Sequence, residues 1–137
     1  MLYSLCLWVG LCGLPNQISG HADAIDGDTI FVLDSSSLTT LRVRLHGIDA
    51  EELFEPHGYQ AKVNLQAIIN GGVGCKLSGE MSYNRHIGTC YNQNGLDVGA
   101  EMVRLGFALD CAHYSHGQYK PLEPANIHSK LIQKTYC

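Results

Sequence analysis

Apolar and polar side chains alternate most clearly between Leu38 and Ile48, which is the pattern of a half-buried strand. One face of this stretch is apolar, and the other carries Arg44 between Arg42 and His46. Upstream, residues 18–33 are rich in strand-forming side chains and are interrupted by an Asp-Gly-Asp turn. We therefore expect the chain to begin with strands, and we expect the side chain of Arg44 to point away from the core.

Two segments further along have the periodicity of helices. Tyr59–Ile69 has an apolar stripe made by Val63, Ala67 and the cluster Leu65, Ile68 and Ile69. It ends at an Asn-Gly-Gly sequence that is typical of a helix stop. Asp97–Leu105 begins with a residue that is a good N-cap and is followed by glycine. A third helix is expected at about 122–132.

Two short strands, Val73–Leu77 and Ile87–Tyr91, lie between the helices and flank a loop at 78–86. The order is therefore three strands, a helix, two strands, a helix and a tail. Short strands with an inserted helix predict an α+β, mainly β domain. The specific prediction is a five-stranded OB-fold Greek-key barrel with about three packed helices, an architecture that binds nucleic acid on one face.

The composition is that of one globular domain. A chain of 137 residues is long enough for a single core, and its hydrophobic content of 45% and charged content of 16% are ordinary. The formal net charge of −4 argues against a protein that binds nucleic acid through a broad basic surface, because such binding uses many Lys and Arg contacts to phosphate. It is compatible with a nuclease whose site draws its positive charge from a cation and a few arginines.

The N-terminal segment has the character of an export signal. Residues 1–17 carry no charged side chain, and the apolar run Leu2–Leu14 is too short to span a bilayer but suits a signal-peptide core. The segment lacks an initial Lys or Arg and a clean cleavage site, so a buried N-terminal strand or helix is the alternative. We expect an imperfect signal at 1–17, a single domain at 18–137, and a secreted or periplasmic mature protein without a membrane anchor.

Carboxylates gather around one arginine between residues 26 and 52. Asp28, Asp49 and Glu52 can offer oxygen ligands to a hard divalent cation such as Ca²⁺. Arg44 suits a phosphate, because its planar fork matches phosphate oxygens in a bidentate manner. A metal, an arginine and a spare carboxylate form a minimal set for hydrolysing a phosphodiester. Taken singly, each aspartate is equally well explained by turn chemistry, since Asp often bonds its own backbone in turns.

Four short motifs, in this order, make the chain resemble the staphylococcal nuclease-like (thermonuclease) family. They are Ile-Asp-Gly-Asp-Thr at 25–29, Arg-Leu-His-Gly-Ile-Asp-Ala-x-Glu at 44–52, Tyr-Asn-Arg at 83–85 and Val-Arg-Leu-Gly-Phe-Ala at 103–108. The resemblance extends from Ile18 to about Glu123. It implies an OB-fold barrel with helices packed around it and Ca²⁺-dependent cleavage of DNA and RNA phosphodiesters.

The resemblance also implies roles for the acidic residues. Asp28 and Asp49 match the calcium carboxylates, and the backbone carbonyl of Ala50 matches a further calcium ligand. Glu52 matches the carboxylate that activates the attacking water. Glu51 stands where the family usually has proline, so we expect it to be an exposed residue that loosens the loop aiming Glu52.

The same resemblance implies roles for arginines and tyrosines. Arg44 and Arg85 match the two arginines that bind the scissile phosphate. Tyr83 and Tyr114 match the tyrosines that line the nucleotide pocket, and Tyr119 is a further candidate for stacking on bases. Asn84 replaces the usual glycine of the turn, where it is expected to tolerate a left-handed backbone.

The cysteines favour an oxidising compartment. Of six cysteines, two lie in the N-terminal apolar run, which leaves an even number and three possible pairings. Cys75 and Cys90 lie on the two strands that flank the loop carrying Arg85, so we expect a disulfide between them. Cys111 and Cys137 form the remaining pair, and four unrelated thiols are the alternative.

Together these features predict a Ca²⁺-dependent, sugar-non-specific endonuclease. Its expected substrates are single-stranded or frayed DNA and RNA, and it is expected to act as a monomer with no stable protein partner. The alternative is a catalytically silent OB-fold module that binds nucleic acid or protein. The joint presence of the carboxylates and both arginines favours the enzyme, and the acidic net charge disfavours a passive nucleic-acid binder.

Overall fold

A computed structural model describes residues 16–137, which form a closed five-stranded barrel in the order β1-β2-β3-β6-β5. Neighbouring strands are antiparallel except β3 and β6, which run parallel. The strands are β1 (Gln17–Ala24), β2 (Thr29–Asp34), β3 (Thr40–Leu45), β5 (Val73–Ser82) and β6 (Arg85–Asn92). The predicted mainly β barrel is confirmed.

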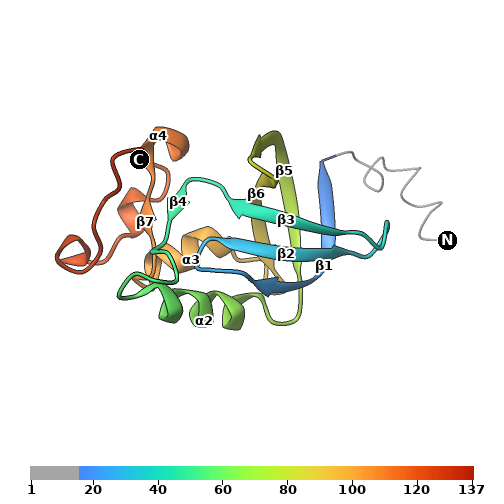
Figure 1. The fold of residues 1–137 in the computed structure, drawn as a ribbon, viewed down its shortest axis with the longest axis horizontal. Helices are drawn as coiled ribbons and strands as arrows, with labels where there is room; N and C mark the ends of the chain where they lie inside the picture. Colours follow the sequence, from blue (N-terminus) through green and yellow to red (C-terminus); the bar gives the residue numbers. More distant parts are fainter. Residues whose placement is uncertain (1–15) are drawn as a thin grey trace.

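The remaining elements pack beneath the barrel and at one of its ends (Figure 1). They are β4 (Ile48–Asp49), α2 (Gly58–Ile69), α3 (Val98–Arg104), β7 (Leu109–Asp110) and α4 (Ala112–Ser115). Strands β4 and β7 pair with each other in a separate two-stranded sheet. In Figure 1, α2 runs below β1 and β2, while β4, β7 and α4 lie together at the left.

The predicted export signal at 1–17 lies almost entirely outside the described residues and stays a prediction. The first described strand, β1, begins at Gln17. Between residues 16 and 137, no helix has the length and apolar character needed to cross a membrane.

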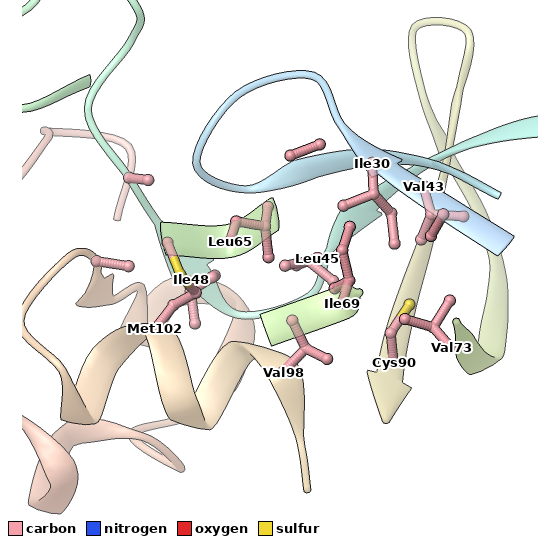
Figure 2. Packing of buried hydrophobic residues seen from close by; sticks show 14 of the residues in the cluster. Ile30, Val43, Leu45, Ile48, Leu65, Ile69, Val73, Cys90, Val98 and Met102 are labelled. Atoms are coloured by element: carbon pink, nitrogen blue, oxygen red, sulfur yellow. The ribbon is translucent and has the colours of Figure 1, made fainter. Parts of the chain in front are cut away.

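The core fills the space between the barrel and the two longer helices. Figure 2 shows side chains from β2, β3, α2 and α3 pointing into this common space, among them Ile30, Val43, Leu65, Ile69 and Met102. Each of these five side chains has 0% of its surface exposed. The barrel and both helices therefore share one hydrophobic core.

Helix α2 buries part of the predicted stripe, namely Leu65 and Ile69. Its buried residues are Gly58, Ala61, Leu65 and Ile69. Val63 and Ala67, which were expected in the stripe, are exposed. Ala61 was not predicted, and its Cβ would lie 2.7 Å from a Cβ added to Gly27, so the helix lies close to the 26–28 turn.

The third helix predicted at about 122–132 is wrong. This part of the chain contains two short 3-10 turns instead, Lys120–Leu122 and Ile127–Ser129. Pro124 removes a backbone N–H inside the predicted helix, and Asn126 takes a left-handed φ of 66°. Both features stop a helix from passing through the segment.

The loop predicted at 78–86 is mostly strand. Strands β5 and β6 continue as far as Ser82 and Arg85, so the turn itself is only Tyr83 and Asn84. The left-handed residue of this turn is Tyr83, with a φ of 59°, rather than Asn84 as expected. The longer hairpin places Arg85 on a strand that is fixed by its neighbours.

Both predicted disulfides are present. Cys75 lies directly opposite Cys90 in the β5–β6 ladder, and the two are bonded. Cys111 is bonded to Cys137, which ties the end of the tail to the start of α4. Two disulfides fit an extracytoplasmic protein.

Replacing both Cys75 and Cys90 by serine should lower the free energy of unfolding by about 3 kcal/mol, because the bond links residues 15 positions apart in the chain. Equilibrium unfolding in urea under non-reducing conditions measures the change. A variant as stable as the wild type would mean that the β5–β6 ladder alone holds this hairpin.

Candidate active site

Three neighbouring strands place the two arginines on one face of the barrel. Thr29 of β2 is opposite Arg44 of β3, which in turn is opposite Ile87 of β6. Arg85 lies two residues before Ile87, so its side chain leaves the strand on the same face. The guanidinium of Arg85 reaches Thr29 Oγ1 at 3.4 Å and Ser82 Oγ at 2.9 Å.

A pocket of about 500 Å³ opens over this face. Its lining includes these predicted site residues: Arg44, Glu52, Tyr83, Arg85 and Tyr114. The other predicted residues, Asp28, Asp49 and Ala50, are buried and do not line the pocket. Arg44, which lines the pocket, contacts the side chains of Asp28 and Asp49.

Arg44 joins the pocket to the buried carboxylates. Its Nη2 lies 3.3 Å from Asp28 Oδ2 and 3.7 Å from Asp49 Oδ1. Its Nη1 donates to the backbone carbonyls of Leu45 at 2.8 Å and Ile48 at 2.9 Å. The guanidinium lines the pocket and contacts both buried carboxylates and two backbone carbonyls.

Arg85 has different partners from Arg44. No carboxylate within residues 16–137 forms an ion pair with it. Its protein contacts are the two hydroxyls of Ser82 and Thr29 and the Ser82 carbonyl at 3.3 Å. Its positive charge is therefore free to bind an anionic group in the pocket.

The Asp-Gly-Asp turn brings Asp28 beside Ala50. A Cβ added to Gly27 would lie 2.6 Å from the Cβ of Ala50 and 2.7 Å from the Cβ of Ala61, so only glycine allows this close approach. The backbone N–H of Asp28 donates to Asp26 Oδ1 at 3.0 Å, and the backbone N–H of Ala50 donates to Asp28 Oδ2 at 2.9 Å.

Burial makes the charged form of Asp28 unfavourable. Burial is the main cause that raises the pKa of Asp28 to about 7, and the charge of Arg44 opposes it. The neighbouring carboxylates of Asp26 and Asp49 raise the pKa further. An ionised Asp28 is costly in this setting, and a bound cation would remove the cost.

The donor set fits a hard cation such as Ca²⁺. Asp28 and Asp49 are buried at 4% and 5% exposure, and both lie within reach of the same guanidinium. Ca²⁺ prefers carboxylate, carbonyl and water oxygens. Across the described range, no group of three or more His, Cys, Asp or Glu side chains is close enough to hold a metal. A cation here would therefore need the backbone and water as ligands beside the two aspartates.

In the loop that carries Glu52, the carboxylates of Glu51 and Glu55 accept hydrogen bonds from the backbone of the same loop. Glu51 Oε1 accepts from the backbone N–H of His57 at 2.7 Å and lies 3.2 Å from its Nδ1. Glu55 Oε1 accepts from the backbone N–H of Glu52 at 2.7 Å. The expectation of an exposed, loosening Glu51 is wrong, because its side chain is only 12% exposed and braces the loop.

The environment of Glu52 favours a proton acceptor. Partial burial raises the pKa of Glu52, and the carboxylate of Asp26 raises it further. Lys134 lowers it, while Asp49 and Glu55 add to the rise. A carboxylate with a raised pKa is a stronger base when it is ionised.

Two residues of the site were missed by sequence reasoning. Tyr136 lines the pocket, and its hydroxyl donates to Asp49 Oδ1 at 2.7 Å. Burial, together with this hydrogen bond, raises the pKa of Tyr136 above its ordinary value. Lys134 Nζ donates to Glu55 Oε1 at 2.9 Å. The available signal was the position of both residues just before Cys137.

The candidate stacking tyrosines divide into two groups. Tyr83 is 95% exposed at the tip of the hairpin, and Tyr114 is 52% exposed on α4, so both can meet a ligand in the pocket. Tyr119 is buried, and its hydroxyl donates to Asp97 Oδ2 at 2.8 Å. Tyr119 is therefore part of the fold and does not stack on bases.

Comparison with known proteins identifies similar chains. Residues 42–134 match the family described as staphylococcal nuclease homologue. The chain is also similar to an uncharacterized endonuclease of Escherichia coli O157:H7 and to one of Escherichia coli. Each is 31% identical over 117 residues, which cover 84% of this chain and 73% of the relative.

A third similar protein is the succinoglycan biosynthesis protein ExoI of Rhizobium meliloti (strain 1021). It is 29% identical over 119 residues, which cover 78% of this chain but only 59% of that protein. The chain therefore spans less than two thirds of the length of this relative. The family match contains Arg44, Asp49, Glu52 and Arg85, while Asp28 lies upstream of it.

Proposed function

Because the chain belongs to the staphylococcal nuclease homologue family, we propose that it is a Ca²⁺-dependent endonuclease that hydrolyses phosphodiester bonds of DNA and RNA. The observation that carries the proposal is that one pocket is lined both by Arg85, which forms no ion pair with a carboxylate of residues 16–137, and by the carboxylate of Glu52. Arg44 connects this pocket to the buried pair Asp28 and Asp49. A passive binding module has no need for such an arrangement.

The residues that would hold Ca²⁺ are Asp28 and Asp49, with the backbone carbonyl of Ala50. When bound, the cation supplies Lewis-acid stabilisation of charge on the phosphoryl oxygens. Arg44 keeps the two carboxylates close together and supplies part of the charge that they need.

The remaining chemistry falls to Glu52 and Arg85. Glu52 accepts the proton of the attacking water, and its loop is held by the Glu51–His57 and Glu52–Glu55 contacts, so the carboxylate is presented to the pocket in a defined way. Arg85 donates its N–H groups to the non-bridging oxygens, where negative charge grows in the transition state.

The tyrosines favour unpaired bases. Tyr83 and Tyr114 border the pocket and offer ring faces on which a base can stack. Stacking tolerates any base, because each has a π-face, but it requires a base that has left its duplex. We therefore propose single-stranded or frayed DNA and RNA as substrates. We also propose that the protein acts as a monomer and that it is secreted or periplasmic.

One experiment tests this function directly. The purified protein is incubated with end-labelled single-stranded DNA in Ca²⁺ and, separately, in EDTA, and circular dichroism checks the fold in both. We expect cleavage in Ca²⁺ alone. A folded protein that shows no Ca²⁺-dependent cleavage would favour the alternative, a catalytically silent module that binds nucleic acid or protein.

Replacing Glu52 by glutamine should lower kcat by about 10²-fold, because general base catalysis is worth at least this much and glutamine cannot accept the proton. Steady-state cleavage of single-stranded DNA gives kcat and KM. Glu80→Gln is the matched control, since Glu80 is an exposed carboxylate on the rim of the same pocket and should keep kcat near the wild-type value. Equal losses in both variants would point to pocket charge rather than to a proton acceptor.

A further inference from the structure

We propose that Tyr136 is a positioning residue for the carboxylate of Asp49, held in place by the Cys111–Cys137 disulfide. The proposal rests on the function proposed above, in which Asp49 is a Ca²⁺ ligand. It concerns residues 132–137, here called the tail segment.

The fold explains how the tail segment reaches Asp49. In the β4–β7 pair, Asp49 is opposite Leu109, and the next residue pair is Ile48 and Asp110. The backbone N–H of Cys111 then donates to the carbonyl of Gly47 at 2.8 Å. Cys111 therefore sits next to the segment that carries Asp49, and the disulfide brings Cys137 to the same place. Figure 1 shows the end of the chain beside α4, close to β4.

The tail segment has no helix or strand, so side-chain and single backbone contacts fix it. Gln133 Nε2 donates to the carbonyl of Asp110 at 3.2 Å, and Lys134 Nζ donates to Glu55 at 2.9 Å. On the other side of Tyr136, the carbonyl of Cys137 accepts from the backbone N–H of His113 at 2.9 Å. The tail is thus anchored on both sides of Tyr136, which limits the positions that its phenol can take.

The contact with Asp49 has the form of an outer-sphere bond to a metal ligand. The Tyr136 hydroxyl donates to Asp49 Oδ1 at 2.7 Å, and Arg44 Nη2 lies 3.7 Å from the same oxygen. Within residues 16–137, both of these contacts of Asp49 go to Oδ1 and no hydrogen bond is made to Oδ2, which leaves Oδ2 for a cation. Hydrogen bonds that orient ligating carboxylates usually contribute a factor of about 10–100 to metal affinity.

A competing role for the Tyr136 hydroxyl predicts the opposite change in Ca²⁺ affinity. If the Tyr136 hydroxyl simply occupied a coordination position, its removal would strengthen Ca²⁺ binding. If it orients Asp49, its removal weakens Ca²⁺ binding while saturating Ca²⁺ restores most of the activity.

The test is calorimetric titration of the folded, metal-free protein with Ca²⁺ alone. We expect the Ca²⁺ Kd of Tyr136→Phe to rise by about 10-fold or more. Tyr59→Phe is the matched control, because Tyr59 is 68% exposed on α2, and its Kd should equal that of the wild type. The double replacement Cys111→Ser/Cys137→Ser should weaken binding at least as much as Tyr136→Phe, whereas Cys75→Ser/Cys90→Ser should not.

The outcomes are distinct. A wild-type protein that binds Ca²⁺ and a Tyr136→Phe variant that binds it equally well or more tightly would overturn the proposal for Tyr136 alone. A wild-type protein that binds no Ca²⁺ would overturn both this proposal and the proposed function. Tyr136→Phe removes one hydroxyl and leaves both disulfides, so it keeps the test decisive even if the double cysteine variant does not fold.

Discussion

Replacing Arg85 by alanine should lower kcat by about 10³-fold or more, the loss seen when a charge-stabilising donor is removed from a transition state. Arg85 is the arginine of the pocket that has no carboxylate partner in the described part of the chain, so its charge is available to the substrate. Its protein contacts go to Ser82 and Thr29, whose polar groups need no charge to balance them. The variant should therefore stay folded while it loses activity.

Steady-state kinetics on single-stranded DNA, with thermal unfolding alongside, measures both effects. Arg85→Lys should fall between the wild type and the alanine variant, because lysine keeps the charge but not the bidentate fork. Arg104→Ala is the control, since Arg104 pairs with Glu101 on the surface of α3 and should leave kcat unchanged. Near-wild-type turnover in Arg85→Ala would instead require Arg44 to stabilise the phosphate.

That alternative is harder to accommodate in this structure. Arg44 donates to the carbonyls of Leu45 and Ile48 and lies against Asp28 and Asp49. To serve as the main phosphate ligand, it would have to give up part of this shell and leave buried carboxylates with less compensation. The two arginines look equivalent in the sequence motifs, and only their partners in three dimensions separate them.

Local signals in the sequence were sufficient for much of the fold. The alternation around Arg44, the glycine after Asp97–Leu105 and the placement of Cys75 and Cys90 on adjacent strands each depend on residues near one another in the chain. The N-cap of α3 is an example, because the side chain of Asp97 accepts from the N–H of Ala100 as expected at 3.1 Å. Such features are set by backbone geometry over a few residues.

The parts that were missed depend on side-chain contacts that the sequence motifs do not indicate. Tyr136 and Asp49 are 87 residues apart, and nothing in either local sequence indicates that they meet. Glu51 was interpreted as an exposed loop residue because proline is usual there, but its carboxylate closes the loop by binding His57. A hydrogen bond from a side chain can stiffen a loop as a proline does. A comparison of motifs shows only that the proline is missing.

The second large effect is expected at Asp28, where asparagine should make the metal-free protein more stable while it abolishes the response to Ca²⁺. Burial and the nearby Asp26 and Asp49 raise the pKa of Asp28 to about 7. A group with a raised pKa favours the folded state below its unfolded pKa of about 3.9, and this contribution is lost as the pH rises through the folded value. At pH 8 an ionised Asp28 is therefore unfavourable, and a neutral asparagine should relieve the cost and still accept from the N–H of Ala50.

Thermal unfolding in EDTA at pH 5 and pH 8, repeated in Ca²⁺, measures this change. The gain in Tm of Asp28→Asn over the wild type should be larger at pH 8. Added Ca²⁺ should raise the Tm of the wild type and not that of the variant, and cleavage should fall by about 10³-fold with the loss of the metal-stabilised transition state.

Asp34 provides a control whose pKa shift has the opposite sign, and its exposed fraction of 6% is close to the 4% of Asp28. Burial tends to raise the pKa of Asp34, but hydrogen bonds from Ser37, Ser19 and Ser36 outweigh it and lower the pKa below its ordinary value. A lowered pKa stabilises the fold above the unfolded pKa, so Asp34→Asn should lower Tm at pH 8 and leave the Ca²⁺ response intact. If Asp28→Asn lost stability in EDTA as Asp34→Asn does, the ionised carboxylate of Asp28 would already be stabilised by its protein contacts. The proposal that Asp28 and Asp49 bind a cation would then lose its support from stability.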